Sequence, residues 1–254
     1  MQISTIVKNL DQFDKDKFLR EGISIEVQAF PQRSLNDDYG HLLDQWSDKL
    51  KGFNLPLSLH GSSFDLNPGS NDKRILEVTK FRYLQSIEIA KVLGVRYVVF
   101  HSQVNPLLSV KRIRNMKLMN QITFWKDMFN NHIPEDMVIL LENEYDESFE
   151  DIKTICDGVA NTRLGVCLDI GHSLAYSQLD LEEWIKGLGS RIRYIHLHWN
   201  DGSSDSHLPP SKSQILYLRD LLKKYAIDPI ITQEYYKDNQ LAETKRIQKI
   251  LMKP

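Results

Sequence analysis

The segment Ile192-Arg-Tyr-Ile-His-Leu-His-Trp-Asn-Asp-Gly-Ser-Ser-Asp-Ser-His207 joins an apolar, β-branched run to a loop rich in acidic and imidazole side chains. If the apolar part forms a strand, its two-residue period places His196 and His198 on one face. In the loop, Asp205 and His207 form an Asp-x-His pair, and carboxylates and neutral imidazoles are common ligands of divalent transition metals. The segment therefore predicts a strand that carries candidate metal ligands at its carboxyl end.

The same unit recurs along the chain, because short β-branched runs alternate with longer stretches of helical apolar spacing, as in βα units. The predicted strands are 3–7, 23–30, 55–60, 95–101, 138–142, 164–169, 192–198 and 230–234. The predicted helices are 14–20, 38–51, 72–93, 110–131, 149–159, 181–187, 214–225 and 240–252. Eight units in 254 residues predict an α/β protein, a single (β/α)₈ TIM-barrel domain over residues 1–254. The alternative, an open doubly wound sheet, would normally show a Gly-rich first turn, which this sequence lacks.

Composition excludes several classes of protein. The chain is 41% hydrophobic and 26% charged, as in soluble globular proteins, and no apolar run approaches the roughly 20 residues that span a bilayer. The amino terminus lacks the pattern of a secretory signal, so we expect a cytoplasmic protein without a membrane partner. The 32 basic and 34 acidic residues give a net charge of −2, which provides no footprint for wrapping nucleic acid. Cys156 and Cys167 lie in different predicted elements, so we expect neither a disulfide framework nor a cysteine zinc site.

Acidic and imidazole side chains gather where the predicted strands end, which is where TIM-barrel active sites are built. They are Glu26, His60, His101, Glu142, Asp169, His172, His196, His198, Asp205, His207 and Glu234, and they include six of the eight histidines. Four of them would meet from successive strands, and they would repel one another and lose solvation unless a cation held them. These four are Glu142, Asp169, His196 and Glu234. The sequence therefore predicts a metal centre at one mouth of the barrel.

Three motifs in this set resemble those of the xylose isomerase-like TIM-barrel superfamily, which includes sugar-phosphate isomerases and epimerases and the endonuclease IV proteins that cut DNA at abasic sites. Leu141-Glu-Asn143 resembles the fifth-strand carboxylate motif, and Gly165-Val-Cys-Leu-Asp-Ile-Gly-His172 resembles the sixth-strand motif of both branches. The run from His196 to Pro210 is similar to the His-x-x-Asp-Asn-x-Gly…Asp-x-His-Leu-Pro-Pro-Gly-x-Gly pattern of the isomerase and epimerase branch. Two departures stand out, since Trp199 occupies the place of the usual Asp and Ser211-Lys-Ser213 replaces the Gly-x-Gly.

The resemblance implies a first divalent metal, Mn²⁺, Zn²⁺, Co²⁺ or Mg²⁺, held by Glu142, Asp169, His196 and Glu234. It allows one to three ions, because the nuclease branch binds three zinc ions and its five remaining ligand positions match residues of this chain. Those five are His60, His101, His172, Asp205 and His207. The seventh-strand ligand stays open, since the isomerase pattern selects His196, which we prefer, and the nuclease pattern selects His198. The candidate substrate-binding residues are His198, Asn143, Glu26 and Lys212.

Two functions follow from the resemblance. In the first, a divalent-metal-dependent isomerase or epimerase acts on a small-molecule sugar or sugar phosphate, with Glu142 and Glu234 as the acid/base pair. In the second, the protein is an endonuclease IV-like zinc phosphodiesterase or another metallohydrolase. The endonuclease would act on nucleic acid. We favour the first, because Gly61-Ser-Ser-Phe64 lacks the bulky pair expected of the nuclease after His60, and the other rim loops are not notably basic. A barrel that binds a ligand without catalysis is a third interpretation, and an oligomer is compatible with the sequence.

Overall fold

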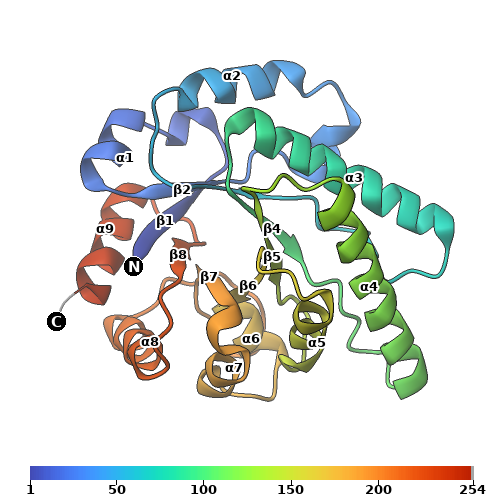
Figure 1. The fold of residues 1–254 in the computed structure, drawn as a ribbon. Coiled ribbons are helices and arrows are strands. Elements are labelled where there is room, and N and C mark those ends of the chain that lie inside the picture. Colours follow the sequence, from blue (N-terminus) through green and yellow to red (C-terminus); the bar gives the residue numbers. More distant parts are fainter. Residues whose placement is uncertain (253–254) are drawn as a thin grey trace.

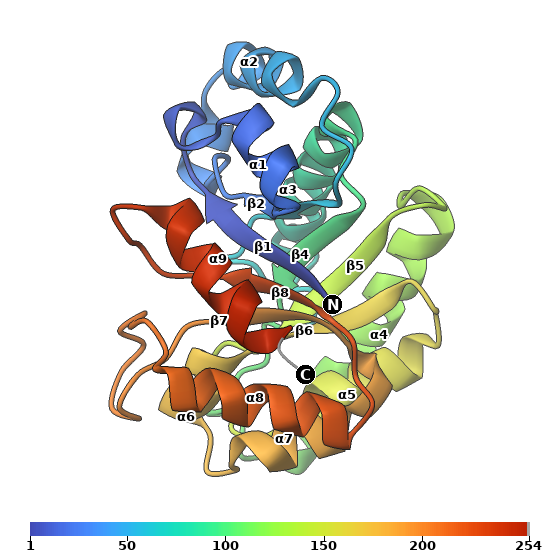
Figure 2. The same cartoon turned by 90° about the vertical axis from the view of Figure 1, so that its left-hand side faces the viewer.

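We describe the chain from a computed structural model, which covers residues 1–252. Eight parallel strands form one closed barrel in the order β1 to β8, and β8 pairs with β1. The strands are β1 (Gln2–Val7), β2 (Ser24–Val27), β3 (Leu57–His60), β4 (Tyr97–His101), β5 (Val138–Glu142), β6 (Leu164–Asp169), β7 (Ile192–Leu197) and β8 (Ile230–Gln233). Figures 1 and 2 show the barrel from two directions, with the strands inside a ring of helices. The predicted TIM barrel is confirmed.

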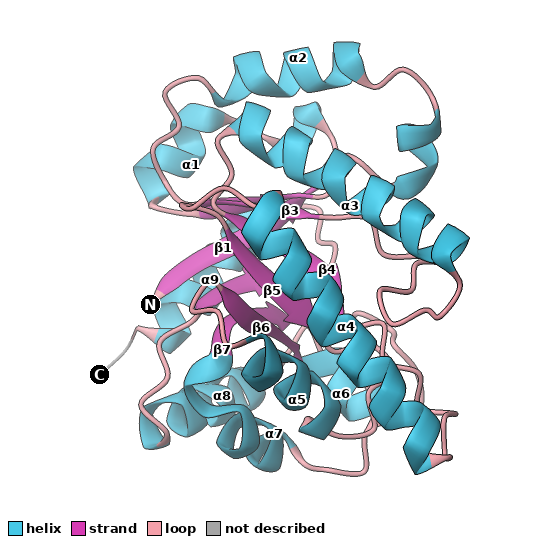
Figure 3. Ribbon diagram, turned by 45° about the vertical axis from the view of Figure 1, so that its right-hand side comes forward, coloured by secondary structure: helices cyan, strands magenta, loops and turns pink. Residues whose placement is uncertain are grey.

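Helices cover the outside of the strands, as Figure 3 shows. They are α1 (Lys15–Glu21), α2 (Gly40–Leu50), α3 (Lys73–Leu93), α4 (Lys111–Asn131), α5 (Glu150–Val159), α6 (Ile170–Tyr176), α7 (Leu181–Leu188), α8 (Lys212–Lys224) and α9 (Gln240–Leu251). In α7, for example, Leu181, Trp184, Ile185 and Leu188 are buried at the spacing of one helical face. Over residues 1–252, every helix is too short or too polar to cross a membrane.

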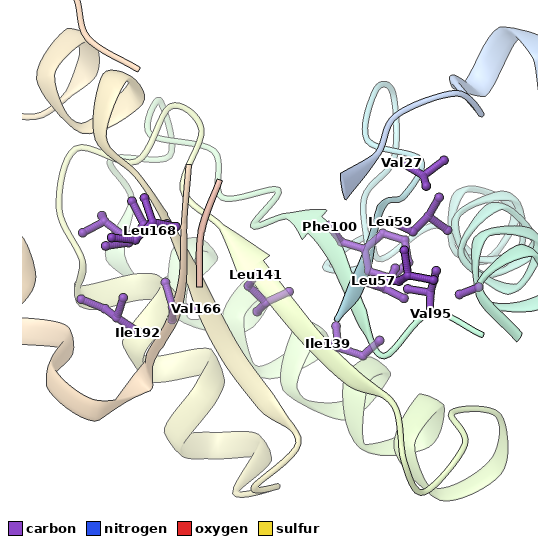
Figure 4. Packing of buried hydrophobic residues seen from close by; sticks show 14 of the residues in the cluster. Val27, Leu57, Leu59, Val95, Phe100, Ile139, Leu141, Val166, Leu168 and Ile192 are labelled. Carbon is purple, nitrogen blue, oxygen red and sulfur yellow. The ribbon is translucent and has the colours of Figure 1, made fainter. Parts of the chain in front are cut away.

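The two faces of each strand meet different surroundings. Outward-facing residues such as Leu59, Leu141 and Leu168 pack beneath the helices and form most of the hydrophobic core (Figure 4). Inside the barrel, a small apolar cluster around Val99 and Tyr194 fills the lower layer. Above it the inward-facing residues become polar, because the two-residue period continues to the acidic and imidazole groups at the strand ends. The strands thus aim these groups into one space.

A hydrogen-bonded layer separates the apolar part of the interior from the polar part. The Tyr194 hydroxyl accepts a hydrogen bond from Thr232 Oγ1 at 2.5 Å and lies 2.6 Å from Ser58 Oγ. All three side chains are buried, and they come from β7, β8 and β3. The layer ties three strands together directly beneath the level of the candidate metal ligands.

Most predicted strands and helices are shifted by a few residues at one end or both, and two differences bear on the site. β2 ends at Val27 rather than at residue 30, because its pairing with β1 stops at Val7 and Val27 and the chain then turns into a short 3₁₀ helix (Gln32–Asn36). Helix α6 was not predicted, and it begins directly after β6, where Asp169 Oδ1 accepts the His172 N–H at 2.6 Å. Asp169 therefore ends a strand and caps a helix at the same time.

The loop after β7 is closed on itself. Trp199 and Leu208 exchange two backbone hydrogen bonds of 2.8 Å and form an antiparallel bridge. His207, which lies directly before the second bridge residue, has a left-handed backbone conformation with φ 45°. The bridge holds residues 200–207 as one compact loop over the barrel mouth, and that loop carries Asp205 and His207.

Candidate metal centre

The last inward-facing residues of four neighbouring strands meet at the carboxyl-terminal mouth of the barrel. Glu142 and Asp169 end β5 and β6, His196 lies in β7, and Glu234 directly follows β8. His196 Nδ1 lies 2.8 Å from Glu142 Oε1, 3.0 Å from Glu234 Oε2 and 3.8 Å from Asp169 Oδ2. All four side chains are buried, and their potential ligand atoms lie within 4.8 Å of one another. We call these residues the central group; they are the four that the sequence predicts to share a cation.

A second group adjoins the central group through Glu142. His60 Nε2 lies 3.2 Å and His101 Nε2 lies 3.6 Å from Glu142 Oε2, whereas Oε1 faces His196. The rings of His60 and His101 meet edge to face, with their centroids 5.2 Å apart. The Glu142 carboxylate therefore offers one oxygen to the central group and the other to this pair of histidines.

A third group lies on the side of the closed loop after β7. Asp205 Oδ2 lies 3.1 Å from His207 Nε2 and 3.3 Å from His172 Nε2. The ring of His198 stacks on that of His207, with 3.9 Å between their centroids. The loop thus places its carboxylate beside the imidazoles of His172, His198 and His207, and these four residues form the third group. Asp169, His172 and His198 also lie close enough to share an ion, so every one of the nine predicted metal ligands belongs to a set of potential ligands.

Four of the six imidazoles at the mouth share one arrangement, in which one ring nitrogen faces a ligand carboxylate and the other is hydrogen-bonded to a second oxygen acceptor. The second contacts are His60 Nδ1 to Gly61 O (3.0 Å), His172 Nδ1 to Asn143 O (2.8 Å), His196 Nε2 to Glu26 Oε2 (3.0 Å) and His207 Nδ1 to Glu234 O (2.6 Å). An N–H donated to such an acceptor fixes the tautomer and leaves the lone pair of the other nitrogen for a cation. Histidines that bind metal ions are held in this way.

Two imidazoles differ. His101 Nδ1 lies 3.0 Å from Glu144 Oε2 and is buried without a hydrogen-bond partner. The second is His198. Its Nε2 lies 2.9 and 3.0 Å from the two carboxylate oxygens of Asp169, while its Nδ1 is buried without a hydrogen-bond partner. Gly171 makes room for the ring, because a Cβ at that position would lie 1.8 Å from His198 Cε1. This geometry favours His196 as the histidine of the central group and gives His198 the task of orienting Asp169.

Protons and a metal ion would compete for the same lone pairs in these groups. Burial opposes a charge on His60, but the hydrogen bond and the negative charge of Glu142 outweigh burial and raise the pKa of His60 to about 9. Burial likewise opposes a charge on His172, and Asp169 and Asp205 raise its pKa to about 11. For Glu142, burial disfavours the carboxylate, yet His196 outweighs it and holds the pKa well below its ordinary value.

Unpaired atoms test whether these residues fit a metal. His101 Nδ1, Glu234 Oε2, Asp205 Oδ1 and His198 Nδ1 are buried and have no hydrogen-bond partner, although Glu234 Oε2 is only 3.0 Å from His196 Nδ1. Each unpaired buried polar group costs about 1–3 kcal/mol, and a cation at the mouth would satisfy those that point toward it. Mixed carboxylate and imidazole donors suit Zn²⁺, Mn²⁺ and Co²⁺. The residues present therefore fit a divalent metal centre.

A cavity of about 670 Å³ opens onto these groups from the outside. Its lining includes Glu142 and Glu234 but not Asp169 or His196, which lie beneath. Cavities of about 300–1,000 Å³ are typical of small-molecule sites. A molecule that enters would thus meet the two glutamates of the central group first.

None of the four predicted substrate-binding residues lines this cavity. The side-chain amide of Asn143 is hydrogen-bonded to the backbone of Asp169. Asn143 Nδ2 donates to the carbonyl oxygen of Asp169, and Asn143 Oδ1 accepts from its N–H, both at 2.9 Å. Glu26 and His198 are fully buried behind His196 and Asp169, respectively. Lys212 begins α8 with an exposed side chain. The structure thus brings three of the four to the metal centre, where they hold other residues of the site.

Two further residues contact the candidate ligands and were not singled out from the sequence. Gln28 Nε2 donates to Glu26 Oε1 at 2.8 Å and to Glu234 Oε1 at 2.9 Å. Glu144 Oε2 lies 3.0 Å from His101 Nδ1. Each lies two residues beyond an inward-facing carboxylate, Glu26 or Glu142, so the strand alternation continued past the strand end would have indicated both.

Comparison with known proteins places the chain among barrels of related architecture. Residues 21–252 match the family model described as a xylose isomerase-like TIM barrel. The chain is 28% identical over 166 residues to the probable endonuclease 4 of Aquifex aeolicus, and this match spans 61% of the chain but only 57% of that protein.

Solved structures give a similar result. A D-tagatose 3-epimerase-like protein superposes with a TM-score of 0.76 at 20% identity, over 99% of this chain and 96% of that one. The IOLI protein, solved with a bound zinc atom, superposes with a TM-score of 0.71 at 16% identity, over 99% and 98% of the two chains. At these identities the superpositions establish a shared fold, and they leave the reaction open.

Proposed function

Because the chain belongs to the xylose isomerase-like TIM-barrel family, we propose that it is a divalent-metal-dependent isomerase or epimerase that acts on a sugar or a sugar phosphate. The observation that carries the proposal is that Glu142 and Glu234 belong to the central group and also line the cavity. Two carboxylates in that position can each reach a carbon-bound proton of a molecule that is held at the metal.

The proposed metal ligands are Glu142, Asp169, His196 and Glu234. When bound, a divalent cation supplies Lewis-acid polarisation of the sugar carbonyl and so acidifies the adjacent C–H bond. For both glutamates, burial disfavours the ionised form, but in the metal-free protein the charge and the hydrogen bond of His196 outweigh burial and hold the pKa well below its ordinary value. Each carboxylate is therefore ionised and free to accept a proton. One glutamate would remove the proton next to the carbonyl, and the other would help return a proton to the sugar from its own side.

The size of the cavity also favours a small substrate. About 670 Å³ is more than a hexose or a hexose phosphate needs, and the rim carries the basic side chains of Lys8 and Arg33, which suit a phosphate group. Duplex DNA would need a longer basic surface that follows its backbone.

A zinc-dependent phosphodiesterase of the endonuclease IV type, or another metallohydrolase, is the second candidate. It is supported by the three adjoining groups of potential ligands, since hydrolytic centres use neighbouring ions to stabilise the attacking and the leaving oxygen. The similarity to the Aquifex aeolicus protein points the same way. Under this alternative the groups around His60 and Asp205 would each hold a further ion.

Hydrogen exchange distinguishes the two candidates. Metal-loaded protein is incubated in D₂O with a panel of ketoses and ketose phosphates, and NMR follows replacement of the proton next to the carbonyl. We expect exchange with the wild type and a loss of at least about 10³-fold in Glu142→Gln and in Glu234→Gln. Glu77→Gln, the same chemical change at an exposed site on α3, should leave the rate unchanged.

The contrary result is equally specific. Chelator-sensitive cleavage of a duplex with an abasic site, in the absence of sugar hydrogen exchange, would replace the isomerase with the phosphodiesterase. Full exchange activity in either glutamate variant would remove that residue from the acid/base pair. Circular dichroism of each variant confirms that the barrel is intact.

A further inference from the structure

Glu26 is a buried carboxylate that the proposed reaction does not use. It faces the barrel interior from β2, its exposed fraction is 0%, and it does not line the cavity. Burial of a carboxylate is costly unless hydrogen bonds and an opposite charge compensate it. Both of its oxygens are occupied, because Oε2 lies 3.0 Å from His196 Nε2 and Oε1 accepts the Gln28 amide at 2.8 Å.

We propose that Glu26 and Gln28 form a positioning pair that sets which atoms of His196 and Glu234 face the metal. The inference rests on the metal centre of the proposed function and extends it to two residues outside the ligand set. Glu26 acts through His196, and Gln28 acts through Glu234.

The contact between Glu26 and His196 selects a tautomer. With a cation at the central group, Nδ1 supplies its lone pair, and the single proton of the neutral imidazole then lies on Nε2, where the Glu26 carboxylate accepts it. The lone pair is then on Nδ1, which lies 2.8 Å from Glu142 Oε1 and 3.0 Å from Glu234 Oε2. A lone pair between two carboxylate oxygens is stable only when a cation lies among them.

Gln28 selects an oxygen of Glu234 in a similar way. Its Nε2 carries two hydrogens, and they go to Glu26 Oε1 at 2.8 Å and to Glu234 Oε1 at 2.9 Å. Glu234 Oε1 is thereby engaged, whereas Oε2 is buried without a hydrogen-bond partner beside His196. The backbone N–H of Gln28 bonds to Val7 O, which anchors the amide where β2 ends. The Gln28 amide therefore links Glu26, which lies behind His196, to the proposed ligand Glu234.

Metal affinity tests the pair without reference to turnover. The dissociation constant for Zn²⁺ is measured by competition with a chromophoric chelator, and the Co²⁺ form is examined by visible absorption. Glu26→Gln replaces one of the two acceptor oxygens by an amide nitrogen. The variant side chain therefore cannot keep the contacts of Glu26 with both His196 and Gln28. We expect affinity to fall about 10- to 100-fold with a changed Co²⁺ spectrum. Glu77→Gln is the matched control, and it should change neither property.

A double-mutant cycle separates positioning from a general loss of structure. If Glu26 acts through His196, Glu26→Gln should change the affinity less than about twofold once His196→Ala is present. The same loss in both backgrounds, or an unchanged affinity in Glu26→Gln alone, would overturn the proposal. If Glu26→Gln does not fold, the cycle of Gln28→Leu with Glu234→Ala decides by the same criterion.

The two measurements, Zn²⁺ affinity and sugar hydrogen exchange, distinguish failure of the positioning pair from failure of the proposed function. A wild type that binds Zn²⁺ and loses affinity in Glu26→Gln, yet exchanges no sugar hydrogen, keeps the positioning pair and loses the isomerase. Unchanged affinity in the variant, together with sugar hydrogen exchange, gives the reverse result. A wild type that binds neither Zn²⁺ nor Co²⁺ rejects both.

Discussion

Asp146, in the loop between β5 and α5, is a buried carboxyl group whose Oδ2 accepts hydrogen bonds from Ser102 Oγ at 2.7 Å and from the Glu144 N–H at 3.0 Å. Burial outweighs these bonds and raises its pKa to about 7. Because this folded-state pKa lies above that of the unfolded chain, the group favours folding when protonated. Its contribution to stability is therefore lost as the pH rises from about 4 through 7.

We expect Asp146→Asn to remove this loss, since the amide oxygen can accept both bonds. The free energy of unfolding of the variant should exceed that of the wild type by up to about 4 kcal/mol at about pH 8, and the difference should shrink toward about pH 4. Denaturant unfolding of metal-free protein at several pH values measures it. Parallel pH profiles for the two proteins would mean that Asp146 is ionised in the folded state at neutral pH.

Gly171 matters because of the space that it leaves for His198. An added Cβ would lie 1.8 Å from the ring, so Gly171→Ala must displace His198 from the Asp169 carboxylate. We expect weaker Zn²⁺ binding, by about tenfold, and a lower free energy of unfolding. Gly94→Ala is the control, because Gly94 has φ 68° and no atom within 4 Å of an added Cβ. It should cost about 1 kcal/mol of stability and leave metal affinity unchanged, and equal affinities in both variants would exclude a role for His198 in orienting Asp169.

Asn143 joins the ends of β5 and β6. Its buried amide pairs with both the N–H and the C=O of Asp169, each at 2.9 Å. In Asn143→Ala both backbone groups would lose their partners inside the protein, and we expect the free energy of unfolding to fall by about 2–4 kcal/mol. Denaturant unfolding measures the change. A loss below about 0.5 kcal/mol would mean that the two strand ends are held by other contacts.

The order of the strands and helices could be predicted because hydrophobic periodicity is a local property. β5 and β6 have their predicted bounds, since each apolar run ends in a carboxylate, Glu142 or Asp169. The end of β2 could not be predicted in this way, because the residues after Val27 continue an apolar pattern, whereas the pairing stops at Val7, the last residue of β1. Helix α6 has only seven residues and starts at the end of β6, so no helical period was visible.

The candidate site could be predicted as a set but not as a network. Strand ends converge in every TIM barrel, so the position of Glu142 or Asp169 follows from the order of the elements. The contact of Asn143 with the backbone of the next strand depends on the register between strands, which the sequence pattern does not contain. For the same reason, the choice of ring nitrogen at His196 and the bridge through Gln28 needed three-dimensional distances.

The charge of the barrel mouth predicts how metal affinity changes with pH. Hydrogen bonds and charges from carboxylates outweigh burial and raise the pKa of His60 and of His207 to about 9, and that of His172 to about 11. These imidazoles are therefore protonated at neutral pH in the metal-free protein, and a metal must displace protons to bind. Apparent affinity should rise as the pH increases from about 7 to 9.

Calorimetry can count the protons. Titration of Zn²⁺ in buffers of different ionisation enthalpy should give more than about one proton released per chain at neutral pH. His207→Ala should reduce the number of protons released. A pH-independent affinity, with no proton release, would mean that the imidazoles at the mouth are already neutral.

The backbone bridge between Trp199 and Leu208 has a consequence for how such a barrel can diversify. It lets residues 200–207 close upon themselves outside the sheet, while the four side chains of the central group come from three strands and from the residue directly after β8. An inserted, shortened or transplanted segment between the two bridge residues would alter the third group and the contact of His207 with Glu234 O, and it would leave the four ligand side chains in the barrel. Replacement of this loop would therefore change how many ions the mouth can bind, and with it the chemistry of the site, while the barrel itself stays the same.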